Sequence, residues 1–233
     1  MDPRFWPLYG LRITTPRLEL RLPGLDLLDD LASVAADGVH DPAEMPFSLP
    51  WTDAAPEDVG RAIFQHVLRT VAEWQPQKWC LSLAVLRDGK VVGRQDLFAT
   101  DFAVTRQAET GSWLGLAHQG HGIGTEMRAA VLHLAFAELD ADWAVSDAML
   151  DNPRSLGVSR HLGYRPDGLA LASARGQSRT LQRLRLSRAE WEAHRTVPVE
   201  VAGLDEGCRG LFGQTRSDRS DWSDWSEQAG VTA

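Results

Sequence analysis

The sequence is poor in cysteine and contains no long apolar run. Its two cysteines, Cys80 and Cys208, cannot build a disulfide framework, and no cluster of cysteine and histidine has the spacing of a zinc site. No segment approaches the ~20 uninterrupted apolar residues that a membrane helix needs, and the N-terminus lacks the apolar core of a secretory signal. These absences predict a cytoplasmic protein with reduced thiols that binds neither a metal nor a membrane.

Basic charge is also scarce. The 233 residues carry 24 basic and 32 acidic side chains, a net charge of −8, and only Lys78 and Lys90 are lysines. A protein that binds nucleic acid regardless of its sequence needs a basic surface to displace counterions from phosphate, so no nucleic-acid partner is expected. The acidic balance is compatible with a cationic acceptor such as an amine, although many proteins are acidic only for solubility.

Helical and strand patterns alternate over most of the chain, and 43% hydrophobic residues suffice for one large domain. Asp88-Gly89 between two apolar runs predicts a β-hairpin. The predicted order is β-α-α-β-β-β-α-β-α-β-β, a mixed α/β sheet in which antiparallel hairpins flank one parallel pair. The predicted strands are 17–22, 79–87, 90–98, 109–116, 143–150, 168–173 and 179–186, and the predicted helices are 25–37, 56–74, 123–139, 152–162 and one that begins at Ser187.

Composition divides the chain into three parts. Residues 1–187 contain nearly all the regular patterns and are predicted to form a single domain. Residues 188–214 are expected to pack on this domain as a C-terminal extension. Residues 215–233 carry a short Ser-Asp repeat and offer almost nothing to bury, so they are predicted to form a disordered tail.

A glycine-rich loop joins a predicted strand to a predicted helix. Three glycines, Gly120, Gly122 and Gly124, fall within five residues, which is more than a tight turn requires. The unpaired N–H groups at the start of a helix bind anions, above all phosphate. The loop therefore predicts a phosphate site.

Two well-known phosphate-binding motifs do not fit this loop. A P-loop needs Gly-Lys-Ser/Thr, and the loop contains no lysine. The dinucleotide-binding pattern Gly-x-Gly-x-x-Gly fails because Thr125 stands where its third glycine belongs. The hairpin before the loop also rules out the repeated βαβ halves of that fold.

The loop instead follows the pattern Gln-x-x-Gly-x-Gly, with Gln119, Gly122 and Gly124. In this motif the sequence resembles the GNAT superfamily of acyl-CoA-dependent N-acyltransferases, and more narrowly the branch of ribosomal-protein alanine acetyltransferases and their small-molecule relatives. The resemblance implies a central, mostly antiparallel, splayed sheet flanked by helices. Further matches within residues 12–187 are Thr15-Pro-Arg-Leu18, Gly111-Ser-Trp-Leu114, Asn152-x-x-Ser155 and Arg160-x-Leu-Gly-Tyr164.

The resemblance also implies how acetyl-CoA, or another acyl-CoA, is held, without a metal. The end of the strand at Leu114 and Leu116 is expected to pair with the pantetheine amides. Asn152 is expected to hydrogen-bond the pantetheine arm, and Arg160 either reaches a CoA phosphate or is a solvated charge. The loop residues expected to bind the pyrophosphate are Gln119, Gly120, Gly122, Ile123, Gly124 and Thr125.

Acyl transfer to an amine needs a base for the amine proton and an acid for the leaving thiolate. Related enzymes of this branch place a serine at the position of Ser155, which is therefore the candidate acid. The alternative is a serine that makes only local hydrogen bonds at a helix N-terminus. Glu109, on the same strand face as Gly111 and Trp113, is the candidate base, and the alternative is a solvated acid at a strand start.

The connection over residues 39–55 is rich in proline and aromatic residues, and no regular element explains it. In the family, the first two helices and the loop between them wall the acceptor site. Phe47, Trp51 and Asp53 are therefore candidate acceptor-binding residues.

The resemblance implies an N-acyltransferase that moves an acetyl or other short acyl group from the CoA thioester to a primary amine by direct attack. The acceptor is expected to be a small molecule or a peptide, and a homodimer is compatible with the family. Two alternatives stay open. One is a catalytically silent acyl-CoA-binding regulatory protein, and the other is a relative whose acyl donor is carried by a protein or a tRNA.

Overall fold

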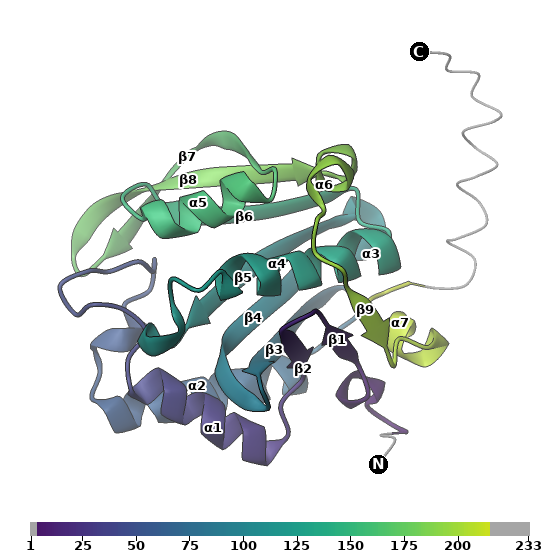
Figure 1. Ribbon diagram of the computed structural model, residues 1–233, viewed down its shortest axis with the longest axis horizontal. Coiled ribbons are helices and arrows are strands. Elements are labelled where there is room, and N and C mark those ends of the chain that lie inside the picture. Colours follow the sequence, from purple (N-terminus) through teal and green to yellow (C-terminus); the bar gives the residue numbers. More distant parts are fainter. Residues whose placement is uncertain (1–3, 215–233) are drawn as a thin grey trace.

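The computed structural model describes residues 4–214, which contain one open sheet of nine strands (Figure 1). The strands lie in the order β7-β8-β6-β5-β4-β3-β2-β1-β9. All neighbouring strands run antiparallel except β5 and β6, which are parallel. The strands are β1 Arg12–Thr14, β2 Leu18–Arg21, β3 Lys78–Arg87, β4 Lys90–Thr100, β5 Gln107–Leu114, β6 Trp143–Met149, β7 Arg165–Ala174, β8 Gln177–Ser187 and β9 Glu200–Ala202.

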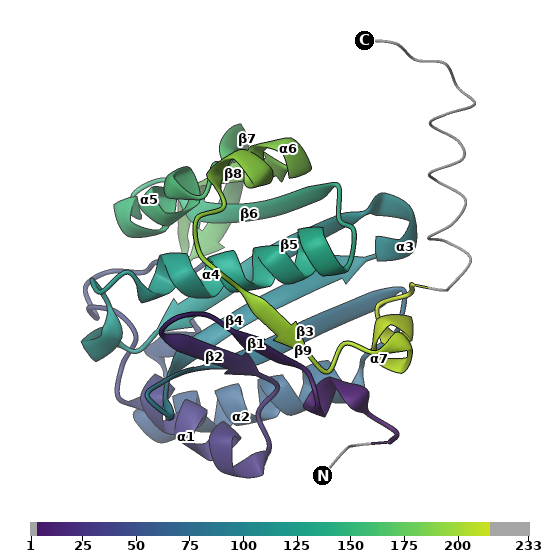
Figure 2. The same cartoon turned by 45° about the vertical axis from the view of Figure 1, so that its right-hand side comes forward.

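Helices cover both faces of this sheet. α1 and α2 lie side by side on one face, whereas α4 crosses the other face with α5 beside it (Figures 1 and 2). α4 ends in a π-helical turn, Leu134–Glu138, before the chain enters β6. The helices are α1 Leu25–Ala36, α2 Pro56–Ala72, α3 Phe102–Thr105, α4 Ile123–His133, α5 Pro153–His161, α6 Arg188–His194 and α7 Glu206–Leu211.

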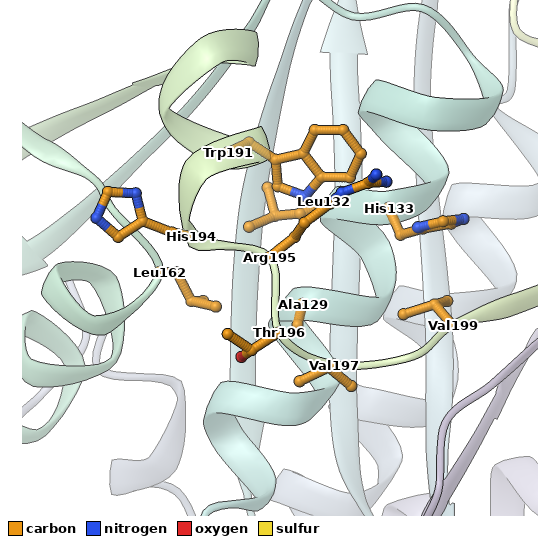
Figure 3. Close-up of a pocket in the computed structure, with 10 residues that line it drawn as sticks. All are labelled: Ala129, Leu132, His133, Leu162, Trp191, His194, Arg195, Thr196, Val197 and Val199. Atoms are coloured by element: carbon orange, nitrogen blue, oxygen red, sulfur yellow. The ribbon is translucent and has the colours of Figure 1, made fainter.

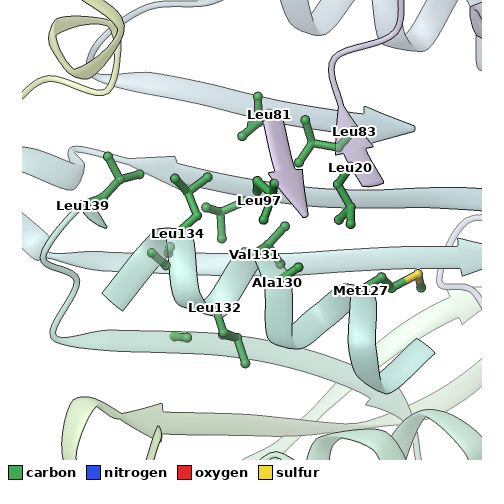
Figure 4. Close-up of a cluster of buried hydrophobic side chains, with 14 of the residues drawn as sticks. Leu20, Leu81, Leu83, Leu97, Met127, Ala130, Val131, Leu132, Leu134 and Leu139 are labelled. Atoms are coloured by element: carbon green, nitrogen blue, oxygen red, sulfur yellow. The ribbon is translucent and has the colours of Figure 1, made fainter. Parts of the chain in front are cut away.

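The main hydrophobic core lies between α4 and the central strands (Figure 4). Side chains alternate between the two faces of β3 and β4, so Leu81 and Leu97 point towards α4. From the helix, Met127, Ala130 and Val131 meet them, and all five side chains are at most 2% exposed. Burying a leucine or valine side chain stabilises the fold by about 2 kcal/mol. This packing fixes the N-terminus of α4 at the end of β5.

The secondary structure predicted from the sequence is confirmed for every long element. Asp88 and Gly89 both have positive φ, as the two-residue turn between β3 and β4 requires. Several boundaries differ from the prediction. The strand predicted for 168–173 spans Arg165–Ala174, and the strand predicted for 109–116 ends at Leu114, after which the chain turns at Gly115. β1, β9, α3 and α7 were not predicted, because three to six residues are too few to display a period.

Residues 188–214 complete the sheet and its core. After α6 the chain crosses the outer surface of α4 and adds β9 antiparallel to β1 (Figure 2). Behind α7, Phe212 is fully buried, and its ring centroid lies 5.4 Å from that of Trp74 and 4.9 Å from that of Trp79. The segment thus shares one core with the preceding residues. Residues 215–233, for which the sequence predicts a disordered tail, lie outside the described residues.

Candidate active site

The sheet opens between its two parallel strands. β5 and β6 pair only at Gln107–Glu109 with Trp143–Val145. Beyond these residues β5 stays with β4 as far as Leu114, while β6 stays with β8 as far as Met149. The two halves of the sheet therefore diverge, which confirms the splayed sheet expected from the sequence. The last residues of β5 have no strand partner on their β6 side, where an extended ligand can pair with the backbone.

The glycine loop lies at the open end of this divergence, where β5 leads into α4 (Figure 1). Within the described residues, the backbone N–H groups of residues 120–125 have no acceptor, and the first paired N–H is that of Glu126, with the carbonyl of Gly122 at 3.2 Å. Gly120 and Gly122 have φ of +80° and +76°, which residues with a side chain rarely adopt. Six consecutive donors at a helix N-terminus fit a pyrophosphate.

Gln119 supports the loop with its side chain. Its Nε2 donates to the carbonyl of Val39 at 2.7 Å and to that of Leu114 at 3.0 Å, and its Oε1 accepts from Arg154 at 3.1 Å. Leu116 differs from the expectation, because it lies beyond the end of β5 in a one-turn helix and its N–H donates to the carbonyl of Gly38. Of the two leucines predicted to pair with pantetheine, only Leu114 lies on the strand.

A buried carboxylate locks the loop to the N-terminal strands. Glu126, in the first turn of α4, is 6% exposed and accepts from Thr15 Oγ1 at 2.7 Å and from Arg17 Nε at 2.6 Å. Arg17 Nη1 also donates to the carbonyl of His121 at 3.0 Å. Sequence reasoning did not assign this function to Arg17, although the Thr-Pro-Arg-Leu motif contains it. The ion pair places a partly exposed guanidinium beside the loop.

Gly124 lies between β5 and α5 and places no side chain between them. A Cβ atom built on Gly124 would lie 3.9 Å from Leu114 Cδ1 and 3.8 Å from Val158 Cγ2, an ordinary contact with both elements. The space between the loop, β5 and α5, hereafter the cleft, is therefore not filled by a side chain at this position. Ile123 is buried beneath it, and Thr125 is half-buried.

The N-terminus of α5 faces α4 across this cleft. Asn152 caps the helix, because its Oδ1 accepts from the N–H of Ser155 at 3.1 Å, while its amide N–H groups have no acceptor within residues 4–214. Ser155 is half-buried, and its hydroxyl makes no hydrogen bond to the described residues. Arg160 is exposed near the other end of the helix and forms no ion pair with a described residue. Asn152 thus has a structural role through its side-chain oxygen, which caps the helix, while its side-chain N–H donors stay available.

Two carboxylates lie near the point where β5 and β6 part. Glu109 is half-buried and pairs in register with Val145, and Asp147 follows Val145 by two residues, so both acids point to the same face of the sheet. Desolvation, and secondarily the charge of Asp147, raise the pKa of Glu109. Desolvation also raises the pKa of Asp147, which sequence reasoning missed. A carboxylate whose pKa is raised is a stronger base than an ordinary one, which suits it to accept a proton.

An aromatic row extends from the long α1–α2 loop to β5. Phe47 lies 5.2 Å from Trp51, and Trp51 lies 5.9 Å from Trp113 between ring centroids. Asp53 accepts three hydrogen bonds from Arg175 in the β7–β8 turn, which lower the pKa of this carboxyl. This contact ties the loop across the acid-bearing face of the sheet. Phe47 and Trp51 thus lie on the same side as Trp113, whereas Asp53 is engaged in an ion pair.

A separate small pocket lies on the outer side of α4, under the segment that follows α6 (Figure 3). Its volume is about 20 Å³, room for about one water molecule. Trp191, His133 and His194 are among its walls, and none of the predicted site residues line it. The pocket therefore lies apart from the residues predicted to bind acyl-CoA.

Metal binding, membrane crossing and thiol reactivity can each be compared with the side chains and helices of residues 4–214. This part of the chain holds no group of three or more His, Cys, Asp or Glu side chains that could bind a metal ion. None of its helices has both the length and the apolar character that a membrane crossing requires. Burial raises the pKa of the Cys208 thiol to about 12, and it also raises that of Cys80, so neither side chain is a reactive thiolate.

The chain belongs to the family described as acetyltransferase (GNAT) domain, whose model matches residues 17–165. It is therefore an N-acetyltransferase by family, as the resemblance of its motifs implies. A curated relative from Bacillus subtilis (strain 168), named "Putative ribosomal N-acetyltransferase YdaF", is 28% identical over 130 residues, which are 54% of this chain and 70% of the relative. This similarity supports the ribosomal-protein acetyltransferase-like branch.

Solved structures agree with the fold. Mycobacterium smegmatis RimJ in complex with CoA-disulfide superimposes with a TM-score of 0.66 at 19% identity, over 79% of this chain and 90% of that one. A GCN5-related N-acetyltransferase from Brucella melitensis gives a TM-score of 0.62 at 21% identity, over 78% of this chain and 80% of that one. At such identities these similarities establish the fold alone.

Proposed function

We propose that this protein transfers an acetyl group from acetyl-CoA to a primary amine of a protein or peptide. The observation that carries the proposal is the row of unpaired N–H groups at residues 120–125, located where β5 and β6 diverge. A pyrophosphate bound by this row directs an extended arm along the free edge of β5. The acetyl group arrives as a thioester, which an amine attacks directly.

Cofactor binding is assigned to the residues around the cleft. The N–H groups of Gly120, Gly122 and the first turn of α4 bind the pyrophosphate, and the Leu114 segment of β5 pairs with the arm. The amide of Asn152, whose oxygen is used in the cap, donates to the arm from the opposite side. Exposed Arg160 is free to approach a phosphate.

Proton transfer is assigned to two residues on the two sides of the cleft. Glu109 accepts the proton of the amine, because its raised pKa makes it a stronger base than an ordinary carboxylate. Ser155, whose hydroxyl makes no hydrogen bond to the described residues, donates a proton to the leaving sulfur. Their positions on β5 and α5 put base and acid on opposite sides of the reacting bond.

The proposed acceptor follows from the relatives and from the acceptor side of the sheet. The curated relative is named for ribosomal N-acetylation, and other solved relatives of similar fold are RimJ and RimL, the latter described as a ribosomal L7/L12 alpha-N-protein acetyltransferase. Glu109 and Asp147 favour a cationic amine, and Phe47 and Trp51 offer apolar surface for the residues that follow an N-terminus.

The test uses the full chain with acetyl-CoA and a panel of peptides that differ only in a free or blocked N-terminus. We expect thiol release and a mass gain of one acetyl group for free N-termini alone. Binding of acetyl-CoA without turnover on any amine would favour a silent binding protein. Failure to bind free CoA would favour a carrier-bound donor.

A further inference from the structure

A buried guanidinium without a counter-ion lies beside the cleft. Arg128 on α4 is 5% exposed, and it forms no ion pair with any carboxylate of residues 4–214. It donates to Ser159 Oγ at 2.8 Å and to Ser112 Oγ at 3.4 Å, and its Nε has no acceptor. Burying a charge with only two hydroxyls as partners is unfavourable for stability. Desolvation accordingly lowers the pKa of Arg128.

Arg128 lies at the inner end of the same cleft, in which Gly124 places no side chain. The two residues are four apart on α4 and therefore share one face of the helix, one turn from each other. Gly124 faces Leu114 of β5, and Arg128 contacts Ser112, two residues earlier on the same face of that strand. On the other side both positions meet α5. A ligand that enters past Gly124 thus advances towards the guanidinium.

The guanidinium also reaches the candidate acid through one intermediate group. Ser159 Oγ accepts from Arg128 and donates to the carbonyl of Ser155 at 3.1 Å. Asn152 Oδ1 accepts from the backbone N–H of Ser155 at 3.1 Å. The backbone of Ser155 is therefore held on both sides by side chains, and one of these links ends at Arg128.

We propose that Arg128 is a positioning residue for acyl transfer. Through Ser159 it fixes Ser155 beside the cleft, and its unmatched positive charge favours the negative charge that the transfer creates there. In the transfer the amine nitrogen forms the C–N bond, and the C–S bond breaks with its electron pair on sulfur. The amine gives a proton to Glu109 and the sulfur takes one from Ser155. Water then reprotonates the serine, and the hydroxide left behind takes the proton from Glu109, so both residues return to their starting state. This inference rests on the proposed function.

The surroundings contain few groups that could mask this charge. From the strand side, β5 presents Thr110 and Ser112, and α5 presents Ser159. The titratable group that acts on Arg128 is the buried phenol of Tyr164, whose charge raises the pKa of the guanidinium. Desolvation raises the pKa of this phenol, which lies 3.5 Å from Thr110 Oγ1. Glu109 lies on the opposite face of β5, and its charge also raises the pKa of Tyr164. The charge of Arg128 is thus left to act on the cleft.

The experiment measures the titration of the CoA thiol bound to the full protein. CoA is added at saturating concentration, and thiolate absorbance is followed against pH for wild type, Arg128→Met and Arg128→Lys. Methionine keeps a similar side-chain length without the charge, and lysine keeps the charge without the planar guanidinium and its several N–H donors. We expect the pKa of the bound thiol to rise by about one unit or more in the methionine variant and to return most of the way in the lysine variant.

Stability and turnover complete the test. Because an unmatched buried charge is removed, Arg128→Met should melt at the same temperature as wild type or higher, while kcat falls about tenfold or more. Ser159→Ala should lower kcat and leave the thiol pKa unchanged, since the charge remains. The same thiol pKa in wild type and Arg128→Met would overturn the inference about Arg128 and leave the proposed function standing. Absence of CoA binding to wild type would overturn the proposed function and the inference together.

Discussion

Gly124→Val tests whether the cleft beside the glycine loop holds CoA. A Cβ at this position meets Leu114 and Val158 at 3.9 Å and 3.8 Å, so the first added carbon fits and the two valine methyls fill the remaining space. Loss of two bonds from backbone N–H groups to a charged phosphate weakens binding by about 3–6 kcal/mol, or roughly 10²–10⁴-fold in Kd. The assay is calorimetric titration with CoA, with a thermal melt to show that the variant is folded.

Two controls separate this effect from helix propensity. Gly124→Ala adds only the carbon that fits, and alanine has a higher helix propensity than glycine. The affinity of this variant for CoA should therefore stay within a fewfold of the wild-type value. Gly210→Val on α7 meets nothing within 4 Å and should leave CoA affinity unchanged. Gly122 is less suitable, because φ of +76° strains any substitution and a Cβ would press on Arg17 at 3.3 Å. Wild-type affinity in a folded Gly124→Val protein would refute the location of the cofactor.

The remaining predictions concern catalysis and the acceptor. Ser155→Ala should lower kcat by roughly 10²-fold with little change in CoA affinity, and activity within about twofold of wild type would return this serine to a structural role. Because the pKa of Glu109 is raised in the folded protein, its charged form destabilises the fold, and Glu109→Gln should not lower Tm. Since glutamine does not titrate, the same variant should flatten the acidic limb of the pH–rate profile. Asp147→Asn removes one of the causes of that raised pKa, so the acidic limb of kcat/KM should move to lower pH, and an unmoved limb would exclude this coupling. Asp53→Asn breaks the ion pair with Arg175 that ties down the α1–α2 loop, and it should raise the acceptor KM while CoA affinity stays constant.

The sequence was sufficient for the elements and for the loop that joins two of them. Strand and helix periods are local properties, and the Asp88-Gly89 turn and the capping box at Ser187 are set by a few neighbouring residues. The glycine loop was visible for the same reason, since unpaired N–H groups at a helix N-terminus follow from the local chain alone. The family resemblance then supplied the splayed sheet, which the pairing of β5 and β6 confirms.

Contacts between distant residues were beyond sequence reasoning. Arg17 and Glu126 are 109 residues apart, and Asp53 and Arg175 are 122 apart, so no local pattern links them. Asp147 gained its significance only when parallel pairing put it on the face of Glu109. The short β9 is a strand only because it pairs with β1, which lies far from it in the sequence.

Arg128 illustrates the difference most clearly. In the sequence it is one polar residue beside the apolar stripe of a helix, a position where a long side chain normally extends to solvent. The sequence by itself determined that this helix forms and begins at the glycine loop, because both depend on neighbouring residues. Only the packing of α4 between β5 and α5 decided that the guanidinium is buried, because burial depends on what three separate segments bring to one place.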